Sequence, residues 1–173
     1  MKPFHETSEF VDVLEYLELI VPVCEEKVWQ FAPIVAKEIT QLGLPKTYAD
    51  WFISVEKVTL SEISEGRKYD FDGHIKTITK ACIIGKNTFG DIVIDVVNGC
   101  VVDLDRSLNQ SQLINTSLTK FLYFVGRMQK SANCQYSDAS TLFEEFNKID
   151  PVPMKNNEGI WSLTTFEAEQ GMY

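Results

Sequence analysis

Two aspartates, Asp103 and Asp105, stand two residues apart in the run VVDLDRS, which spans residues 101–107. Carboxylates at this spacing after an apolar strand could carry out phosphoryl transfer. The first would attack phosphorus, and the second would handle the proton of the leaving group. A Mg²⁺ ion between them would complete such a site. The chemistry therefore depends on the strand that carries the two residues.

The same Asp-x-Asp-x-Ser pattern occurs in haloacid-dehalogenase-like phosphatases, whose aspartate strand is parallel and is followed by a crossover helix. Here Asn98-Gly99 lies between two β-rich runs and predicts a two-residue type I′ turn, so the strand becomes the second arm of an antiparallel hairpin. The segment after residue 106 is also too short for the rest of such a fold. A Mg²⁺-dependent phosphatase using Asp103 and Asp105 is a remote alternative, which predicts activity lost in Asp103→Asn.

No other catalytic pattern stands out in the sequence. His5 and His74 have no partner at the spacing of metal ligands, and the sequence contains neither a Gly-x-Ser-x-Gly elbow nor a phosphate-binding glycine loop. The four cysteines form no Cys-x-x-Cys pair and are expected to be small core residues: Cys24, Cys82, Cys100 and Cys134. We therefore predict a protein that is not an enzyme and that needs no metal or cofactor.

Acidic residues at the expected strand ends suggest a binding surface. Asp91, Asp103 and Asp105 lie where a carboxylate can reach water, so together they could form an acidic rim that steers a basic partner. Equally, such charges could prevent edge pairing between molecules. Asp95 lies within a strand and would need hydrogen-bond donors if it were buried.

The composition is that of one compact domain covering residues 1–173. The chain has 173 residues, of which 45% are hydrophobic and 24% charged, enough apolar surface for a core. Its net charge of -9 argues against nucleic-acid binding, which depends on clustered Lys and Arg. A basic protein partner fits this charge better, although acidity also simply keeps proteins soluble.

The amino-terminal sequence does not resemble a targeting signal. Its apolar positions are interrupted by acidic residues, and no run approaches the ~18 apolar residues that a membrane span needs. Together with the dispersed cysteines, this predicts a cytoplasmic protein that does not bind membranes.

Periodicity divides the chain into helical, strand and helical regions, which predicts an α+β fold. In residues 1–42, apolar positions recur at helical spacing after Ser8, the expected N-cap, and again up to the C-cap Gly43. A short helix is expected over residues 45–52. Strands of an antiparallel β-sheet are expected within residues 52–60, 74–85, 91–97 and 100–105, the last two forming a central Asn-Gly hairpin.

The hairpin turn also predicts a register. With Asn98-Gly99 as the loop, Val93 would face Leu104 and Ile92 would face Asp105. Both faces of the hairpin are largely apolar, so it should be covered on both sides. After residue 106, helices are expected from a cap at Asn115 or Thr116, over residues 140–150 and over residues 160–170, with a linker at 151–159.

Several short motifs follow one another in a definite order over residues 43–173. They are Gly43-Leu44-Pro45 with the aromatic residues after it, Ile84-Gly85, the Asp95 strand, Gly99 with Val101, Asn115-Thr116-Ser117-Leu118 with Phe121 and Leu122, and Trp161 with Gly171. In this order the motifs resemble the SUKH superfamily, named in part after a yeast cell-wall-synthesis regulator. The Asn-Thr-Ser-Leu helix start is the most specific and points to the fourth SUKH immunity group, whereas residues 1–42 have no counterpart.

What the resemblance implies is a binding function. Bacterial members of the superfamily bind and neutralise a cognate toxin domain, often a nuclease or a nucleic-acid deaminase. An acidic inhibitor suits a basic toxin, because complementary potentials speed association. No residue carries over as a contact, and the motif residues are expected to form the fold. The alternative is a non-enzymatic scaffold or regulatory domain, as in eukaryotic relatives, which predicts several partners instead of one.

Overall fold

The amino-terminal region is helical, as predicted, and is followed by short strands. The structure is a computed structural model that describes residues 7–105 and 110–172. Its first elements are α1 (Ser8–Leu14), β1 (Leu19–Ile20), β2 (Val23–Cys24), α2 (Glu26–Phe31), α3 (Pro33–Leu42), β3 (Leu44–Pro45) and β4 (Thr47–Tyr48). The N-cap of α1 is Thr7, which accepts from Phe10 N, instead of the predicted Ser8.

The break between α2 and α3 lies at Pro33, which has no amide hydrogen to continue a helix and occupies the first turn of α3. Gly43 ends α3 with φ 76, as its position in the sequence predicted. The helix expected at residues 45–52 is wrong. Leu44 and Pro45 instead pair with β1, and Thr47 pairs with Ile53, so tertiary contacts override the local helical pattern.

The main sheet is largely antiparallel, and the predicted α+β class is confirmed. Its strands are β5 (Phe52–Phe71), β6 (His74–Lys86), β7 (Gly90–Asp95), β8 (Val101–Asp105) and β9 (Gln110–Asn115), which pair in that order. β2 joins the other edge of β5 in parallel, and β4 also pairs with β5. β9 was not expected, because its polar residues give no clear strand pattern.

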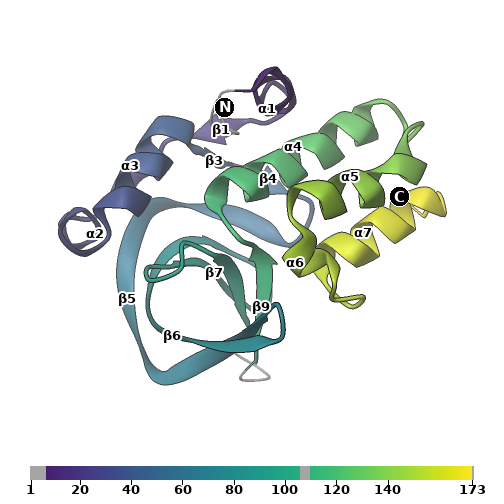
Figure 1. Cartoon of the computed structure of the whole chain (residues 1–173). Helices are drawn as coiled ribbons and strands as arrows, with labels where there is room; N and C mark the ends of the chain where they lie inside the picture. Colours follow the sequence, from purple (N-terminus) through teal and green to yellow (C-terminus); the bar gives the residue numbers. More distant parts are fainter. Residues whose placement is uncertain (1–6, 106–109, 173) are drawn as a thin grey trace.

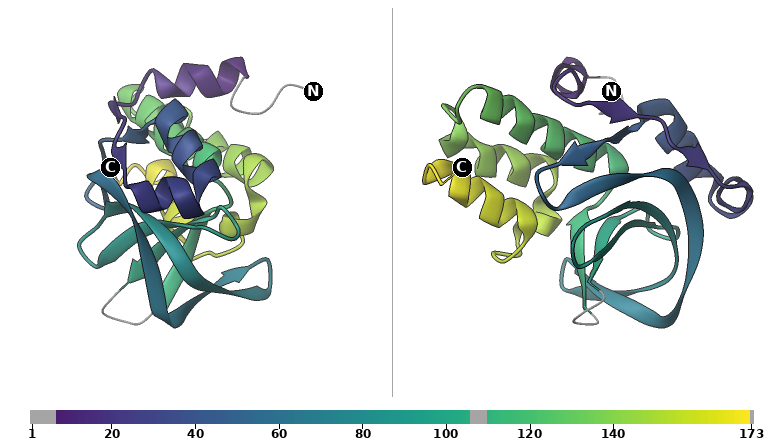
Figure 2. Two further views of the ribbon diagram at one scale, coloured as in Figure 1. Left: turned by 90° about the vertical axis from the view of Figure 1, so that its left-hand side faces the viewer. Right: turned by 180° about the vertical axis from the view of Figure 1, so that it is seen from behind.

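The sheet curls strongly, and Figures 1 and 2 show the long β5–β6 hairpin wrapping around β7 to β9. Two register shifts in β5, after Ser54 and after Glu62, allow this curvature. The curl brings β5 beside β9, and Arg67 Nη1 of β5 donates to the backbone oxygen of Asp105, at the end of β8, at 3.2 Å. Residues distant in sequence thereby meet at one end of the sheet.

The β7–β8 hairpin is central, but its predicted register is wrong by two residues. Val93 pairs with Val102, and Ile92 pairs with Asp103. The cause is Asp95, whose carboxylate accepts from Val97 N and Asn98 Nδ2 and so folds a longer turn before Asn98-Gly99. Because the shift is an even number, each side chain keeps its predicted face.

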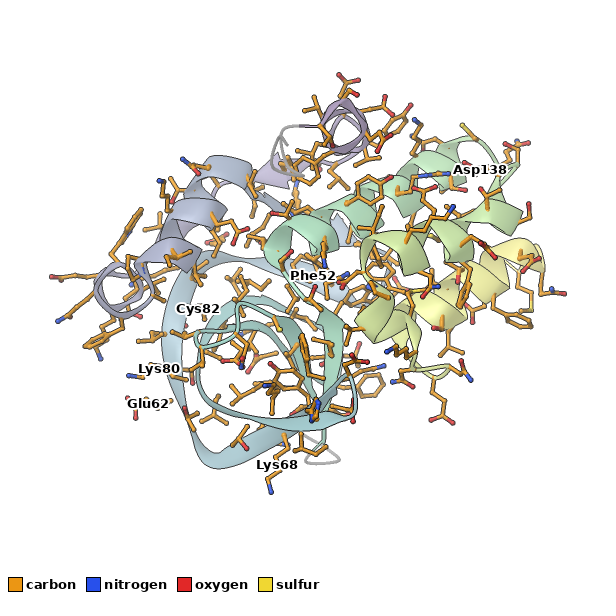
Figure 3. All side chains as sticks on the ribbon, in the orientation of Figure 1. Phe52, Glu62, Lys68, Lys80, Cys82 and Asp138 are labelled. Carbon is orange, nitrogen blue, oxygen red and sulfur yellow. The ribbon has the colours of Figure 1, made fainter. Side chains whose placement is uncertain are left out.

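The carboxyl-terminal part of the chain forms helices that cover the sheet. They are α4 (Leu118–Asn133), α5 (Ala139–Ile149), α6 (Pro151–Met154) and α7 (Ile160–Glu169). The N-cap of α4 is Ser117, one residue after the predicted Thr116. The predicted linker contains α6, whose Pro153 and Met154 are buried. Arg127 joins α4 to α5 through Glu145 and Asp138, the latter labelled in Figure 3.

Buried apolar residues form two clusters on the two faces of the sheet. The larger lies between the sheet and the helices. It includes Phe52 and Phe121, whose rings contact each other edge to face, and Trp161, whose ring contacts that of Trp51 in the same way. Figure 3 shows Phe52 in this layer. The smaller cluster, which includes Val93 and Val102, fills the inside of the curled sheet. Both faces of the central hairpin are therefore covered, as predicted.

Candidate functional site

A cleft of about 570 Å³ opens at the end of the curled sheet. Its walls are β8 and β9, the turn between β5 and β6, and the segment from α6 to the start of α7. The charged residues that line it are Asp70, Asp72, Asp103, Asp105, Lys155 and Glu158. Among the described residues, the lining thus contains five carboxylates and one ammonium group, and we call this region the acidic cleft.

β8 positions two of these carboxylates. Asp103 and Asp105 are two residues apart on one strand, so their side chains leave the same face. Asp103 lies opposite Ile92 of β7 and Gln112 of β9, and both neighbouring strands run antiparallel to β8. The two aspartates are half-buried, not fully exposed as a rim would be.

Asp103 is the most perturbed acid of the cleft. Its Oδ2 accepts a hydrogen bond from Asn87 Nδ2 at 2.8 Å, whereas its Oδ1 is buried and has no hydrogen-bond partner in the part of the chain that the structure describes. Burial raises the pKa of the Asp103 carboxyl to about 6; the Asn87 bond opposes this shift and the nearby charge of Asp105 adds to it. Near neutral pH, Asp103 is therefore an ionised acceptor that a donor from outside could stabilise.

A tight turn between β6 and β7 holds Asn87 in place. Asn87 Oδ1 accepts from Phe89 N and Gly90 N, which leaves its amide nitrogen directed at Asp103. Gly90 is required there, because a Cβ would lie 1.9 Å from Leu104 O. The sequence predicted this hairpin connection but not its contact with Asp103.

The β5–β6 turn forms the opposite wall of the cleft. Asp72 and Gly73 both have positive φ, 56 and 80, the conformation of a type I′ turn. Asp72 forms an exposed ion pair with Lys155, which lowers the pKa of the Asp72 carboxyl. This pair links the turn to the segment after α6, so Lys155, the one lysine among the described lining residues, already has a partner.

The predicted acidic rim is only partly assembled. Asp103 and Asp105 come together in the cleft, but Asp91 lies opposite Leu104 and leaves the other face of the sheet. Sequence reasoning missed Asp70, Asp72 and Glu158, because they reach the cleft through the curl of β5 and the position of α6. The Asp-Gly pair at residues 72–73, a dipeptide that favours turns, was a local signal for the turn but not for the cleft.

The phosphatase alternative receives no structural support. β8 lies between antiparallel neighbours, not beside a parallel strand followed by a crossover helix. Arg106 and Ser107 of the pattern lie outside the described residues. Within residues 7–105 and 110–172, no three His, Cys, Asp or Glu side chains are grouped so that they could hold a metal ion.

The remaining polar candidates lie elsewhere. Asp95 is fully buried and has the donors that its position required, Tyr69 Oη at 3.0 Å and two in its own turn. His74 is exposed at the β5–β6 turn, and His5 lies outside the described residues. Cys82 and Cys100 are buried as predicted, but Cys24 is half-buried and Cys134 is exposed, so the expectation of four core cysteines is wrong.

The Asn-Thr-Ser-Leu motif forms a buried polar network. Asn115 and Thr116 donate to the fully buried carboxylate of Asp150, and Asn115 Oδ1 accepts from Trp161 Nε1 at 2.9 Å. Ser117 caps α4. These side chains tie β9 to the helices and are not among the residues that line the acidic cleft, so we assign them a structural role.

The fold and the cleft define an α+β protein with an acidic concave surface. No family model, curated protein or solved structure matches the chain. None of the described helices is both long enough and apolar enough to cross a bilayer.

Proposed function

We propose that this protein is a bacterial immunity protein that binds and neutralises a cognate toxin domain, and that the acidic cleft receives a basic part of that partner. The toxin class implied by the resemblance to the SUKH superfamily is a nuclease or a nucleic-acid deaminase, whose substrate-binding surface is basic. The protein acts as a cytoplasmic, non-enzymatic inhibitor.

The observation that carries the proposal is the unbalanced charge of the cleft. Among the described residues that line the cleft, carboxylates outnumber ammonium groups five to one, and that ammonium is already paired with Asp72. The guanidinium of Arg67 lies beside one of the acids, Asp105, to whose backbone oxygen it donates. Among the described residues, the buried Oδ1 of Asp103 has no hydrogen-bond donor, and a partner whose binding opened the cleft around it would supply a cation or N–H donor. Burial of Asp103 in an isolated protein costs stability, and a partner offsets this cost only by binding there.

The test is co-expression with the toxin domain encoded by the neighbouring gene, followed by titration of the purified pair at several salt concentrations. We expect cell survival, with tight binding that weakens as salt rises, because the attraction is between exposed charges. Absence of both rescue and complex would exclude this partner and favour the scaffold alternative.

A matched pair of variants locates the surface. Asp105→Lys and Glu144→Lys change the net charge equally, but Asp105 lines the cleft whereas Glu144 is exposed on α5. Asp105→Lys should weaken binding by a factor of about 10–100, since like charges then meet across the interface. Glu144→Lys should change binding much less. Equal losses would show that only the overall charge matters and would remove the cleft from the proposal.

A further inference from the structure

Exposed apolar side chains are concentrated in residues 21–34. They are Val21, Val23, Trp29, Phe31 and Ile34, each between 46% and 81% exposed. We call them together the α2 surface, because they belong to α2 or to the segments on either side of it. A monomer gains no stability from large apolar groups in water, and such clusters usually mark an interface.

The α2 surface includes an open sheet edge. β2 pairs in parallel with β5, where Val23 lies opposite Lys57, and within the described part of the chain β2 has no partner on its other side. The left view of Figure 2 shows α2 facing the viewer, and Figure 1 shows it across the sheet from α6. α6 contributes to the wall of the acidic cleft. An edge strand with exposed valines can accept another strand.

The charges of this region nearly balance. Residues 21–34 contain Glu25 and Glu26 against Lys27, and Lys37 lies one turn beyond Ile34 on the same face of α3. Beside α2, Lys80 Nζ lies 4.9 Å from the centre of the Phe31 ring and 3.5 Å from Glu62 Oε1. Figure 3 shows Lys80 and Glu62 on this side of the sheet.

A balanced surface is what a symmetric interface requires. In a two-fold dimer each patch meets a copy of itself, so a patch of one charge would repel its partner. A strongly basic partner would instead be drawn to the acidic cleft. The charge pattern therefore separates two surfaces, one acidic and suited to a basic protein and the other neutral and suited to itself.

We propose that the α2 surface is the interface of a homodimer, in which two copies pack about a two-fold axis with their β2 edges antiparallel. The five side chains expose roughly 500 Å² per copy, and a stable interface buries about 800 Å² per partner. The apolar residues supply most of that area, and the balanced Glu and Lys residues supply a polar rim. The proposal is independent of the toxin-binding function.

Sedimentation velocity across micromolar concentrations tests the proposal directly. The full chain, with reductant present so that the exposed Cys134 cannot form a disulfide, should sediment as a reversible dimer. Ile34→Glu should weaken the dimer by roughly a hundredfold, since two copies of the new charge would be buried at the interface. Phe166→Glu is the control, because Phe166 is likewise an exposed apolar residue, 54% exposed against 81% for Ile34, but lies on α7; it should leave the dimer intact.

Hydrogen exchange at low and high protein concentration supplies a readout without mutation. Amides of residues 21–34 should gain protection as the dimer forms, and those of α7 should not. The proposal is overturned by a wild-type monomer at every concentration, by a dimer that Ile34→Glu leaves unchanged, or by protection confined to another segment. If the exposed apolar residues bind a different protein instead, the wild type would remain a monomer at every concentration.

Discussion

Replacing Asp150 by alanine tests whether the buried network at the start of α4 holds the helices to the sheet. Asp150 is fully buried, and its carboxylate accepts from Asn115 Nδ2, Thr116 N, Thr116 Oγ1 and Lys120 Nζ at 2.7–3.2 Å. The variant leaves the first three donors inside the protein without an acceptor. The Lys120 side chain is 31% exposed, so its ammonium can turn toward water.

The magnitude follows from these contacts. Each unsatisfied buried donor costs about 1–3 kcal/mol, and loss of one member of a buried ion pair costs about 3–5 kcal/mol. Because Lys120 can be rehydrated and the remaining donors can share a water molecule, we expect the free energy of unfolding to fall by about 3–4 kcal/mol.

Urea unfolding followed by circular dichroism measures this loss. Asp12→Ala is the control, because Asp12 also forms a lysine ion pair, with Lys130, but at an exposed position. Its effect should stay within about 0.5 kcal/mol. If Asp150→Ala cost no more than this control, the network would not hold the helices, and the structural role given to Asn115 and Thr116 would be refuted.

Three further variants test the inside of the sheet, the cleft and the packing of α1. The raised pKa of Asp103, about 6, means that the folded protein holds a proton which the unfolded chain releases near pH 4, so ionisation destabilises the fold as pH rises. Asp103→Asn should therefore leave the free energy of unfolding almost unchanged at about pH 4 and raise it by roughly 1 kcal/mol at about pH 7.5, after allowance for solvent screening. Urea midpoints without this pH dependence would contradict the burial of Asp103. Tyr69→Phe removes a donor from the buried Asp95 and should cost about 1–2 kcal/mol in thermal unfolding, whereas no loss would mean that the turn donors suffice. Gly126→Ala should destabilise α1 and expose it to proteolysis, because the new Cβ would lie 2.5 Å from Val13 O. Helix propensity alone predicts the opposite, a gain in stability of about 1 kcal/mol. A measured gain in stability would therefore rule out close packing of α1 on α4.

The elements that sequence analysis predicted best are those with a strong apolar period. α1, α4 and α5 appear where the 3.6-residue spacing placed them, and β6, β7 and β8 where β-branched residues are concentrated. β3, β4 and β9 were missed. They are short or polar and become strands only through pairing partners, such as Leu44 with Ile20, that no local pattern reveals.

The register error at the central hairpin has a local cause. The Asn98-Gly99 pair favours a two-residue turn, but only Gly99 adopts positive φ. The Asp95 carboxylate accepts hydrogen bonds from Val97 N and Asn98 Nδ2, and those bonds favour the longer turn. The side-chain acceptor before the turn was therefore as informative as the turn dipeptide itself, and a reading of both would have ended β7 at Asp95.

The cleft could be predicted only in part, because a site built by curvature has no signature in a linear sequence. Asp103 and Asp105 were identifiable since two residues on one strand share a face. Asp72 and Lys155 meet only because β5 bends at its register shifts and brings its far end to α6. The bends themselves depend on pairing with β6, which sequence periodicity does not specify.

The most specific sequence motif therefore describes the fold and not the partner. Asn115, Asp150 and Trp161 are buried and form hydrogen bonds within this network, so they are not available to a second protein. Substitutions that preserve this network can leave the fold intact while the acidic cleft and the α2 surface change freely, because both surfaces are carried by exposed or half-buried side chains. Partner specificity should follow those two surfaces, and a chain that kept the motif but lost the cleft carboxylates would be expected to fold alike and bind differently.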